Sequence, residues 1–175
     1  GRAEIARASG LSTQAVSNII SDLLGEGLLI EQGVRSAGRG LPVQQYAIKP
    51  DGGYAFGVEV RPTAVFTALV DLVGTPLLTH RTLLRSAAKS NILETVSAQL
   101  DSALTEVQIS KGALMGAGIV MPGPFGDTGL TGTESELPGW NTGDPAEIFA
   151  NMLHLPVFVE NDANAAAMAE RMNGV

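Results

Sequence analysis

The clearest pattern in the chain is an amphipathic stretch from Leu11 to Leu28, in which apolar residues recur every three or four positions. This spacing predicts a helix, and Ser12 is a good N-cap for it. The opposite face is polar but uncharged and carries Thr13, Gln14, Ser17, Asn18 and Ser21. Solvated helix faces are normally rich in Lys and Glu, whereas hydroxyl and amide side chains can bond to DNA base edges. We therefore predict that Thr13, Gln14, Ser17 and Asn18 contact DNA.

A second, shorter helical pattern, Ala3 to Ser9, precedes this helix. Gly10 separates the two patterns, as in a helix-turn-helix. The core of a helix-turn-helix needs a further helix in front of this pair. No pattern for it is present, so we expect that the sequence begins partway through a domain.

Two strand patterns follow the helix pair, at 28–30 and 43–48. The loop between them is rich in glycine and contains Arg35 and Arg39. These elements predict a winged helix-turn-helix over residues 1–49, with both arginines on the wing. An arginine among glycines can enter a narrow minor groove of DNA. A flexible, solvated hairpin loop is the alternative interpretation.

The later part of the chain alternates strand and helix patterns. Strand patterns fall at 54–60, 63–71, 76–82, 114–121 and 157–160, and helix patterns at 91–107, 145–153 and 162–172. This order predicts an α/β fold in which helices cover a mixed sheet. Met115 and Met121 flank a strongly apolar strand pattern, and we expect both in the core.

The composition limits the classes of protein to which the chain can belong. The chain has 175 residues, 45% of them hydrophobic, and a mean hydropathy of +0.18, which favours a packed globular protein. No membrane-spanning run or signal peptide is visible, and zero cysteines exclude disulfides; we expect a cytoplasmic protein. The net charge of -7 argues against nucleic-acid binding. However, the first 50 residues carry five basic and four acidic side chains, so DNA could approach this segment most easily.

The motifs in the later part form a recognisable combination. They are GVEV at 57–60, GIVMPGP at 118–124, ELPGW at 136–140 and LPVFVENDANAAAMAE at 155–170. With the winged helix in front, the chain resembles the ROK family, which groups sugar kinases with sugar-responsive transcriptional repressors. The resemblance implies an actin-like (ribonuclease-H-like) ATPase fold whose two lobes close on a sugar. Residues 54–175 would form the first lobe, without the second.

One turn distinguishes the two branches of the family. The kinases place an Asp-x-Gly-Gly-Thr turn after the first strand to cradle ATP phosphate, whereas this chain has Glu59-Val60-Arg61-Pro62-Thr63. Pro62 has no N–H to donate, and Arg61 adds bulk where the backbone must approach phosphate. Arg61 could itself bind phosphate as a cation. The resemblance thus favours a repressor; an ATP-dependent sugar kinase with an appended DNA-binding module is the alternative.

The sugar end of the family pattern is better preserved. Asn161 and Asp162 match the pair that binds sugar hydroxyls in family members, and in kinases the Asp also acts as general base. Asp162 is therefore catalytic only if the chain is a kinase. The competing interpretation is that Asp162 caps the helix that begins at Ala163, while Asn161 shapes the turn.

Three further residues match the loops around the sugar in the family. Gly123 and Pro124 match the loop that lies against the sugar. Glu136 stands just before LPGW, where sugar kinases often have Asn, so the expected effector is a sugar or a sugar derivative. We expect Trp140 to pack within its loop rather than to stack on a ligand.

The resemblance also implies cofactors and partners. The family's structural zinc, held by one His and several Cys, would lie in the missing C-terminal part. Within these residues His80 and His154 are isolated, and we expect no metal. The expected partners are operator DNA, a small sugar effector and further copies of the chain, as a dimer or tetramer, with no membrane.

Overall fold

The computed structural model describes residues 1–35, 42–125 and 137–166, and these form two compact units. Unit 1 comprises Gly1–Gly53 together with Asp71–Gly74, and unit 2 comprises Tyr54–Val70 together with Thr75–Val175. Each unit has a hydrophobic core of its own. The two units are therefore described one after the other.

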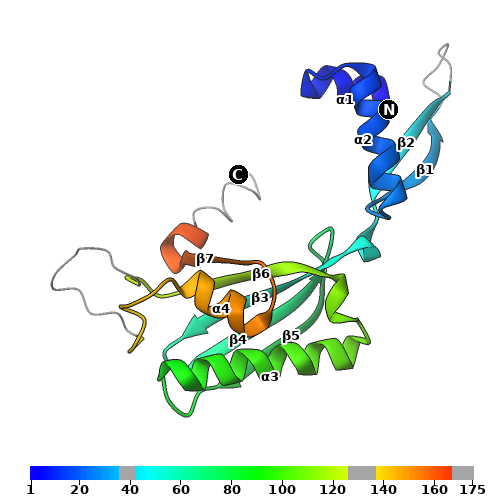
Figure 1. Ribbon diagram of the computed structural model, residues 1–175. Coiled ribbons are helices and arrows are strands. Elements are labelled where there is room, and N and C mark those ends of the chain that lie inside the picture. The colour runs from blue at the N-terminus through cyan, green and yellow to red at the C-terminus, as the bar shows by residue number, and fades with distance from the viewer. Residues whose placement is uncertain (36–41, 126–136, 167–175) are drawn as a thin grey trace. The chain divides into compact units, whose positions relative to one another are not determined.

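Unit 1 contains two helices and a two-stranded antiparallel sheet (Figure 1). Its elements are α1 (Arg2–Ser9), α2 (Thr13–Gly25), β1 (Leu29–Arg35), β2 (Val43–Ile48) and the 3-10 turn η1 (Pro50–Gly52). Gly10, with φ 73, ends α1 in the left-handed conformation that glycine adopts without strain. Ser12 begins α2, because its hydroxyl accepts a hydrogen bond from the Ala15 N–H at 3.1 Å. The N-cap predicted from the sequence is confirmed.

The core of unit 1 is small. Among the residues that the structure describes, its buried hydrophobic cluster consists of Ala6, Val16 and Ile20, with Leu24, Leu29 and Tyr46 packed partly against them. Ile19 belongs to the apolar stripe of α2 but is 45% exposed. The stripe is thus wider than the surface that the described part of unit 1 covers.

The strand β1 is longer than the three-residue pattern that predicted it. It pairs with β2 from Leu29 opposite Ile48 to Arg35 opposite Val43, with a bulge between Glu31 and Gly33. Most side chains of β1 are exposed. An exposed strand needs no apolar alternation, so its length is visible only in the backbone pairing.

Unit 2 is a five-stranded mixed sheet with helices, as predicted from the order of strand and helix patterns. The strand order is β5-β4-β3-β6-β7. The strands β6 and β7 run parallel to β3, whereas β5 runs antiparallel to β4. The elements are β3 (Tyr54–Arg61), β4 (Ala64–Asp71), β5 (Pro76–Leu83), α3 (Lys89–Val107), η2 (Lys111–Ala113), β6 (Leu114–Met121), α4 (Pro145–Leu153) and β7 (Val157–Asn161).

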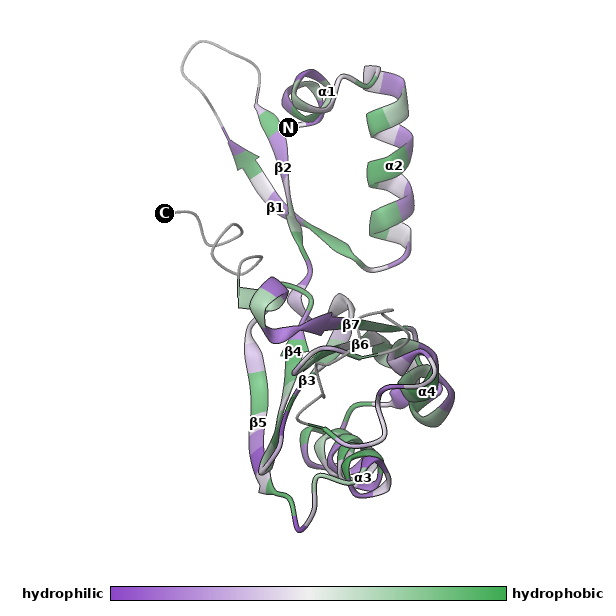
Figure 2. Cartoon of the chain, turned by 90° about the vertical axis from the view of Figure 1, so that its left-hand side faces the viewer, coloured by the Kyte–Doolittle hydropathy of each residue, from purple (hydrophilic) through white to green (hydrophobic). Residues whose placement is uncertain are grey.

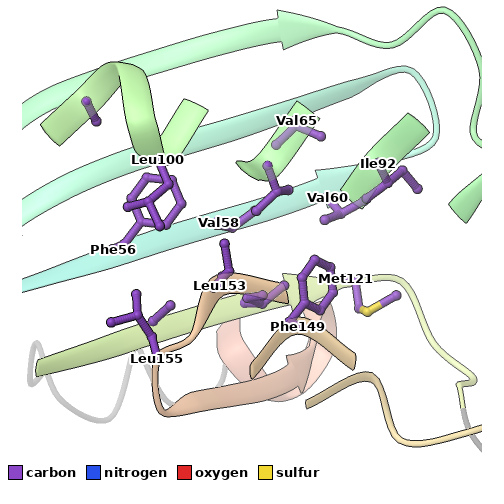
Figure 3. Packing of buried hydrophobic residues seen from close by; sticks show 14 of the residues in the cluster. Phe56, Val58, Val60, Val65, Ile92, Leu100, Met121, Phe149, Leu153 and Leu155 are labelled. Atoms are coloured by element: carbon purple, nitrogen blue, oxygen red, sulfur yellow. The ribbon is translucent and has the colours of Figure 1, made fainter. Parts of the chain in front are cut away.

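The helices α3 and α4 lie on the same face of this sheet (Figures 1 and 2). Side chains from both helices point toward those of the strands in a single core (Figure 3). Its fully buried members include Phe56, Ile92, Leu100, Ile119, Met121 and Phe149. Burial of this continuous apolar surface is the main force that holds the helices on the sheet.

Met115 and Trp140 show how position decides burial. The prediction for Met121 is confirmed, but that for Met115 is wrong, because its side chain is 54% exposed. The pairing of β3 with β6 shifts register between Tyr54 and Ala55, opposite the start of β6, and this irregularity breaks the alternation of buried side chains there. Trp140 is fully buried, with its ring stacked on Phe149 of α4 at 5.1 Å between centroids, so it is a packing residue as predicted, but it packs against α4 rather than within its loop.

Truncation of a core side chain should destabilise unit 2 strongly. We expect Leu100→Ala to lower the free energy of unfolding by about 2–5 kcal/mol, since it leaves a cavity between α3 and the sheet. The matched control is Leu83→Ala, the same truncation at a side chain that is 68% exposed, which should change it by less than about 0.5 kcal/mol. Urea unfolding followed by circular dichroism measures both; equal losses would contradict the assigned core.

Candidate ligand edge and nucleic-acid face

The parallel strands of unit 2 bring three loops to one edge of the sheet. Glu59 near the end of β3 is the register partner of Val120 in β6, and Met121 is the partner of Asn161 in β7. The carboxyl ends of these strands therefore meet at the same edge, which is where open α/β sheets bind ligands.

Two of the predicted sugar-binding positions lie side by side at this edge. A Cβ added to Gly123 would lie 3.6 Å from the Asn161 Cβ, so the loop after β6 runs directly past the end of β7. The Gly123–Pro124 peptide bond is cis. Segments almost forty positions apart in the sequence thus share one corner of unit 2.

Asn161 and Asp162 stand at the beginning of a helical segment whose described part covers 162–166. The Asn161 Oδ1 accepts a hydrogen bond from the Asn164 N–H at 2.7 Å, so Asn161 is the N-cap. Asp162 is the first helical residue, and its Oδ1 lies 2.9 Å from the Ala163 N–H. The competing interpretation, a cap at Asp162, assigned this role to the wrong residue of the pair.

This cap leaves polar atoms of the pair at the surface. Among the described residues no hydrogen bond engages the Asn161 Nδ2 or the Asp162 Oδ2. One is a donor and the other an acceptor, a combination that suits neighbouring hydroxyl groups of a ligand. The positive end of the helix dipole also stabilises the carboxylate. Glu136, the remaining predicted sugar contact, lies outside the described residues.

Arg61 at the end of β3 and Arg81 of β5 form an arginine cluster around the Phe66 ring. The Arg61 Nε bonds to the Glu59 Oε1 at 2.7 Å, and its guanidinium lies 4.7 Å from the centre of the Phe66 ring. The Arg81 guanidinium lies 5.7 Å from the same ring. No sequence motif marks Phe66 or Arg81, because their contact depends on the pairing of Phe66 with Arg81 across β4 and β5.

In unit 1 the uncharged polar face of α2 is accessible. Thr13, Gln14 and Asn18 are exposed, and Ser17 is half-buried. The hydropathy colours alternate along α2, as an amphipathic helix requires (Figure 2). The Gln14 Nε2 donates a hydrogen bond to the Asn18 Oδ1 at 3.0 Å, so these two side chains form one polar group.

The predicted wing is described only in part. Arg35 is the last residue of β1, and its side chain is exposed. Arg39 lies outside the described residues.

In unit 2 the His80 Nε2 lies 3.5 Å from the Glu106 Oε2. Within the described ranges there is no metal-ligating cluster of His, Asp or Glu, and no helix that combines the length and apolarity needed to cross a bilayer.

The fold and its ligand edge define unit 2 as an α/β lobe of the kind found in ROK proteins. The model of the ROK family matches residues 55–175, and the chain belongs to this family.

Curated relatives extend the similarity to almost the whole chain. A xylose repressor of Bacillus subtilis is 29% identical over 176 residues, covering 99% of this chain. An uncharacterised protein, y4fQ of Sinorhizobium fredii, is 30% identical over 170 residues, covering 97% of the chain. The chain spans 45% of the first relative and 43% of the second, less than half of either.

Solved structures give the same picture of the fold. A ROK family transcriptional regulator, a homologue of the E. coli MLC protein, aligns over 98% of this chain and 44% of its own with a TM-score of 0.73 and 21% identity. A ROK glucokinase of Streptomyces griseus, in complex with glucose and AMPPNP, aligns over 70% of this chain and 38% of its own with a TM-score of 0.56 and 26% identity.

The cap at the ligand edge can be tested by a matched pair of substitutions. Asn161→Ala removes the oxygen that caps the helix and should lower the free energy of unfolding of unit 2 by about 0.5–2 kcal/mol. Asn161→Ser keeps a capping oxygen and should stay close to the wild type. Thermal unfolding compares the two, and an equal loss in both variants would rule out the capping role.

Proposed function

We propose that the chain provides the DNA-binding module and the first effector-binding lobe of a sugar-responsive transcriptional regulator, most simply a repressor. Residues 1–49 act as a winged helix-turn-helix, with α2 as the base-reading helix and the β1–β2 hairpin as the wing. Residues 54–175 carry the sugar contacts. The protein would act as a dimer or tetramer, because paired modules read paired half-sites.

The observation that carries this proposal is the presence of unit 1 in front of the ROK lobe. The similarity to the xylose repressor covers 99% of the chain, whereas that to the glucokinase covers 70%, a share close to that of the ROK segment alone. The two helices and hairpin of unit 1 thus accompany the lobe in a relative named as a repressor. This supports a regulator more than an enzyme.

The arginine cluster supports the same choice. A phosphate cradle needs several free backbone N–H groups and small residues. Here Pro62 supplies no N–H, and Arg61 is already bonded to Glu59 and placed over Phe66. An arginine held in this way has lost part of the freedom with which it would bind phosphate. A sugar kinase with an appended DNA module is therefore the second candidate.

The ligand edge supports a sugar as effector. Asn161 and Asp162 present a donor and an acceptor next to Gly123, where the loop after β6 adds no side chain of its own. The names of the curated relatives make D-xylose the first sugar to test. Binding of sugar would alter operator affinity only to the extent that it favours one of two conformations.

Binding to DNA should depend on the wing arginines. A random-sequence duplex library is used to select the preferred DNA of the full chain, and affinity for it is measured by fluorescence anisotropy at several salt concentrations. We expect Arg35→Ala and Arg39→Ala each to weaken binding and to reduce the salt slope by about 1, since each removes a cation near phosphate. The control is Arg85→Ala, an exposed arginine of unit 2, and wing variants that match it would contradict the assignment.

Sugar binding should appear as thermal stabilisation of the full chain. We expect D-xylose, or another sugar of a small panel, to raise the melting temperature, with a stabilisation of about 2.7 kcal/mol at a concentration of 100 Kd. Asp162→Asn, which removes the charged acceptor, should reduce the shift. A coupled ATP-consumption assay on the same panel tests the kinase alternative; turnover that Asp162→Asn abolishes would overturn the regulator assignment.

A further inference from the structure

A hydrogen bond joins Gln14 and Asn18 on the polar face of α2 and holds these two side chains in a defined arrangement. The two residues are one helical turn apart, near the beginning of α2, and both are exposed. The Gln14 Nε2 lies 3.0 Å from the Asn18 Oδ1. The bond restricts a long, flexible side chain that would otherwise sample many rotamers.

The direction of this bond decides which groups remain available. Gln14 uses one of the two N–H groups of its amide to reach Asn18. The second N–H and the Gln14 Oε1 remain, and an amide carries them side by side. The Gln14 amide therefore still presents one donor and one acceptor.

Adenine is the base whose major-groove edge complements that pattern. It offers the N7 acceptor beside the N6 donor, and a glutamine amide can bond to both. Guanine offers two acceptors, so the Gln14 Oε1 would face another lone pair. Cytosine offers only a donor there, and thymine only an acceptor and a methyl group.

The surroundings of the pair favour contact with DNA over a role in helix stability alone. The neighbouring side chains of Thr13 and Ser17 are short, and the first charged residue of α2 is Asp22, one further turn beyond Asn18. Asp22 lies on the same face as Asn18, so the uncharged part of this face is limited to the first turns of α2, where Gln14 stands two turns away from the carboxylate. A bond between exposed amides adds little to the stability of a helix.

We propose that Gln14, oriented by Asn18, reads an adenine at one position of each operator half-site. This inference rests on the proposed function, because it assumes that α2 enters the major groove. Gln14 is the base-reading residue, and Asn18 is a positioning residue that acts through it. Recognition of one base pair would then come from two side chains of α2, independently of the arginines on the wing.

The test compares base preferences of variants of the full chain. Wild type, Gln14→Ala, Gln14→Glu and Asn18→Ala are each taken through the random-sequence selection. The dissociation constants are then measured on duplexes that carry each of the four base pairs at every selected position. Gln99→Ala, the same truncation on α3 of unit 2, is the control.

For the wild type we expect an A·T pair in each half-site, preferred by about 5- to 150-fold over the other pairs. Gln14→Ala should lose this preference at that position alone. Gln14→Glu should change it toward C·G, because a carboxylate accepts from the cytosine amino group. Asn18→Ala should weaken the preference by about 2- to 10-fold, since Gln14 is no longer held.

Three outcomes would overturn the inference. If Gln14→Ala keeps the wild-type preference at every position, Gln14 does not read a base, although the proposed function stands. If Gln14→Glu shows no change of preference while circular dichroism shows a folded protein, the amide pattern is not what is read. If the wild type selects no motif at all, both this inference and the proposed DNA-binding function fail.

Discussion

The parallel pairing of β3, β6 and β7 is the constraint on which the ligand edge depends. Parallel neighbours end at the same side of a sheet, so whatever follows them in the sequence is brought together. The last pairing requires close backbone contact, because the Ala117 N–H bonds to the Pro156 carbonyl at 2.8 Å. A Cβ on Gly116 would lie only 2.9 Å from that carbonyl oxygen. Glycine at this position therefore allows β7 to pair closely with β6. This pairing in turn places Asn161, at the end of β7, beside Gly123 in the loop after β6.

The two sides of this edge differ in the chemistry of their side chains. After β6 and β7 the chain has a glycine, an amide and a carboxylate, which suit uncharged hydroxyl groups. After β3 it has Arg61 and Pro62, and the arginine is tied to Glu59 and Phe66. Glu59 belongs to β3 itself and Phe66 to the neighbouring strand β4, so these contacts fix the Arg61 side chain against the sheet. This arrangement supports the proposal that the lobe binds a sugar without transferring a phosphoryl group to it.

In the proposed function, two elements of unit 1 contribute differently to DNA recognition. The described face of α2 offers hydrogen bonds without charge, and the β1–β2 hairpin offers the arginines. Uncharged groups at base edges supply specificity, while cations near phosphate supply affinity that depends on salt. In the described part of unit 1 the buried hydrophobic cluster has three residues, so burial of apolar surface contributes little to the stability of its fold. Capping at Ser12 and the left-handed Gly10 accordingly contribute much of the definition of the helix pair.

Several features could be predicted from the sequence alone, because they depend on residues that are close together in the sequence. Helical periodicity and a side-chain cap define α2, and the apolar runs of β3, β4 and β6 specify strands whatever lies beside them. The Pro62 substitution weakens a phosphate loop in any surroundings, because proline lacks an N–H. The motifs around Gly123 and Asn161 likewise carried the family resemblance before any fold was known.

Tertiary structure decided the features that depend on register. The exposure of Met115 follows from a shift in strand pairing, and the contact of Phe66 with Arg81 from the alignment of β4 with β5. The cap at Asn161 rather than Asp162 follows from where the chain turns into the helix after β7. The sequence by itself determined which residue types stand at these positions and which elements they enter. Only the folded chain determined which of them meet, because those contacts join residues far apart in sequence or depend on one hydrogen bond of the backbone.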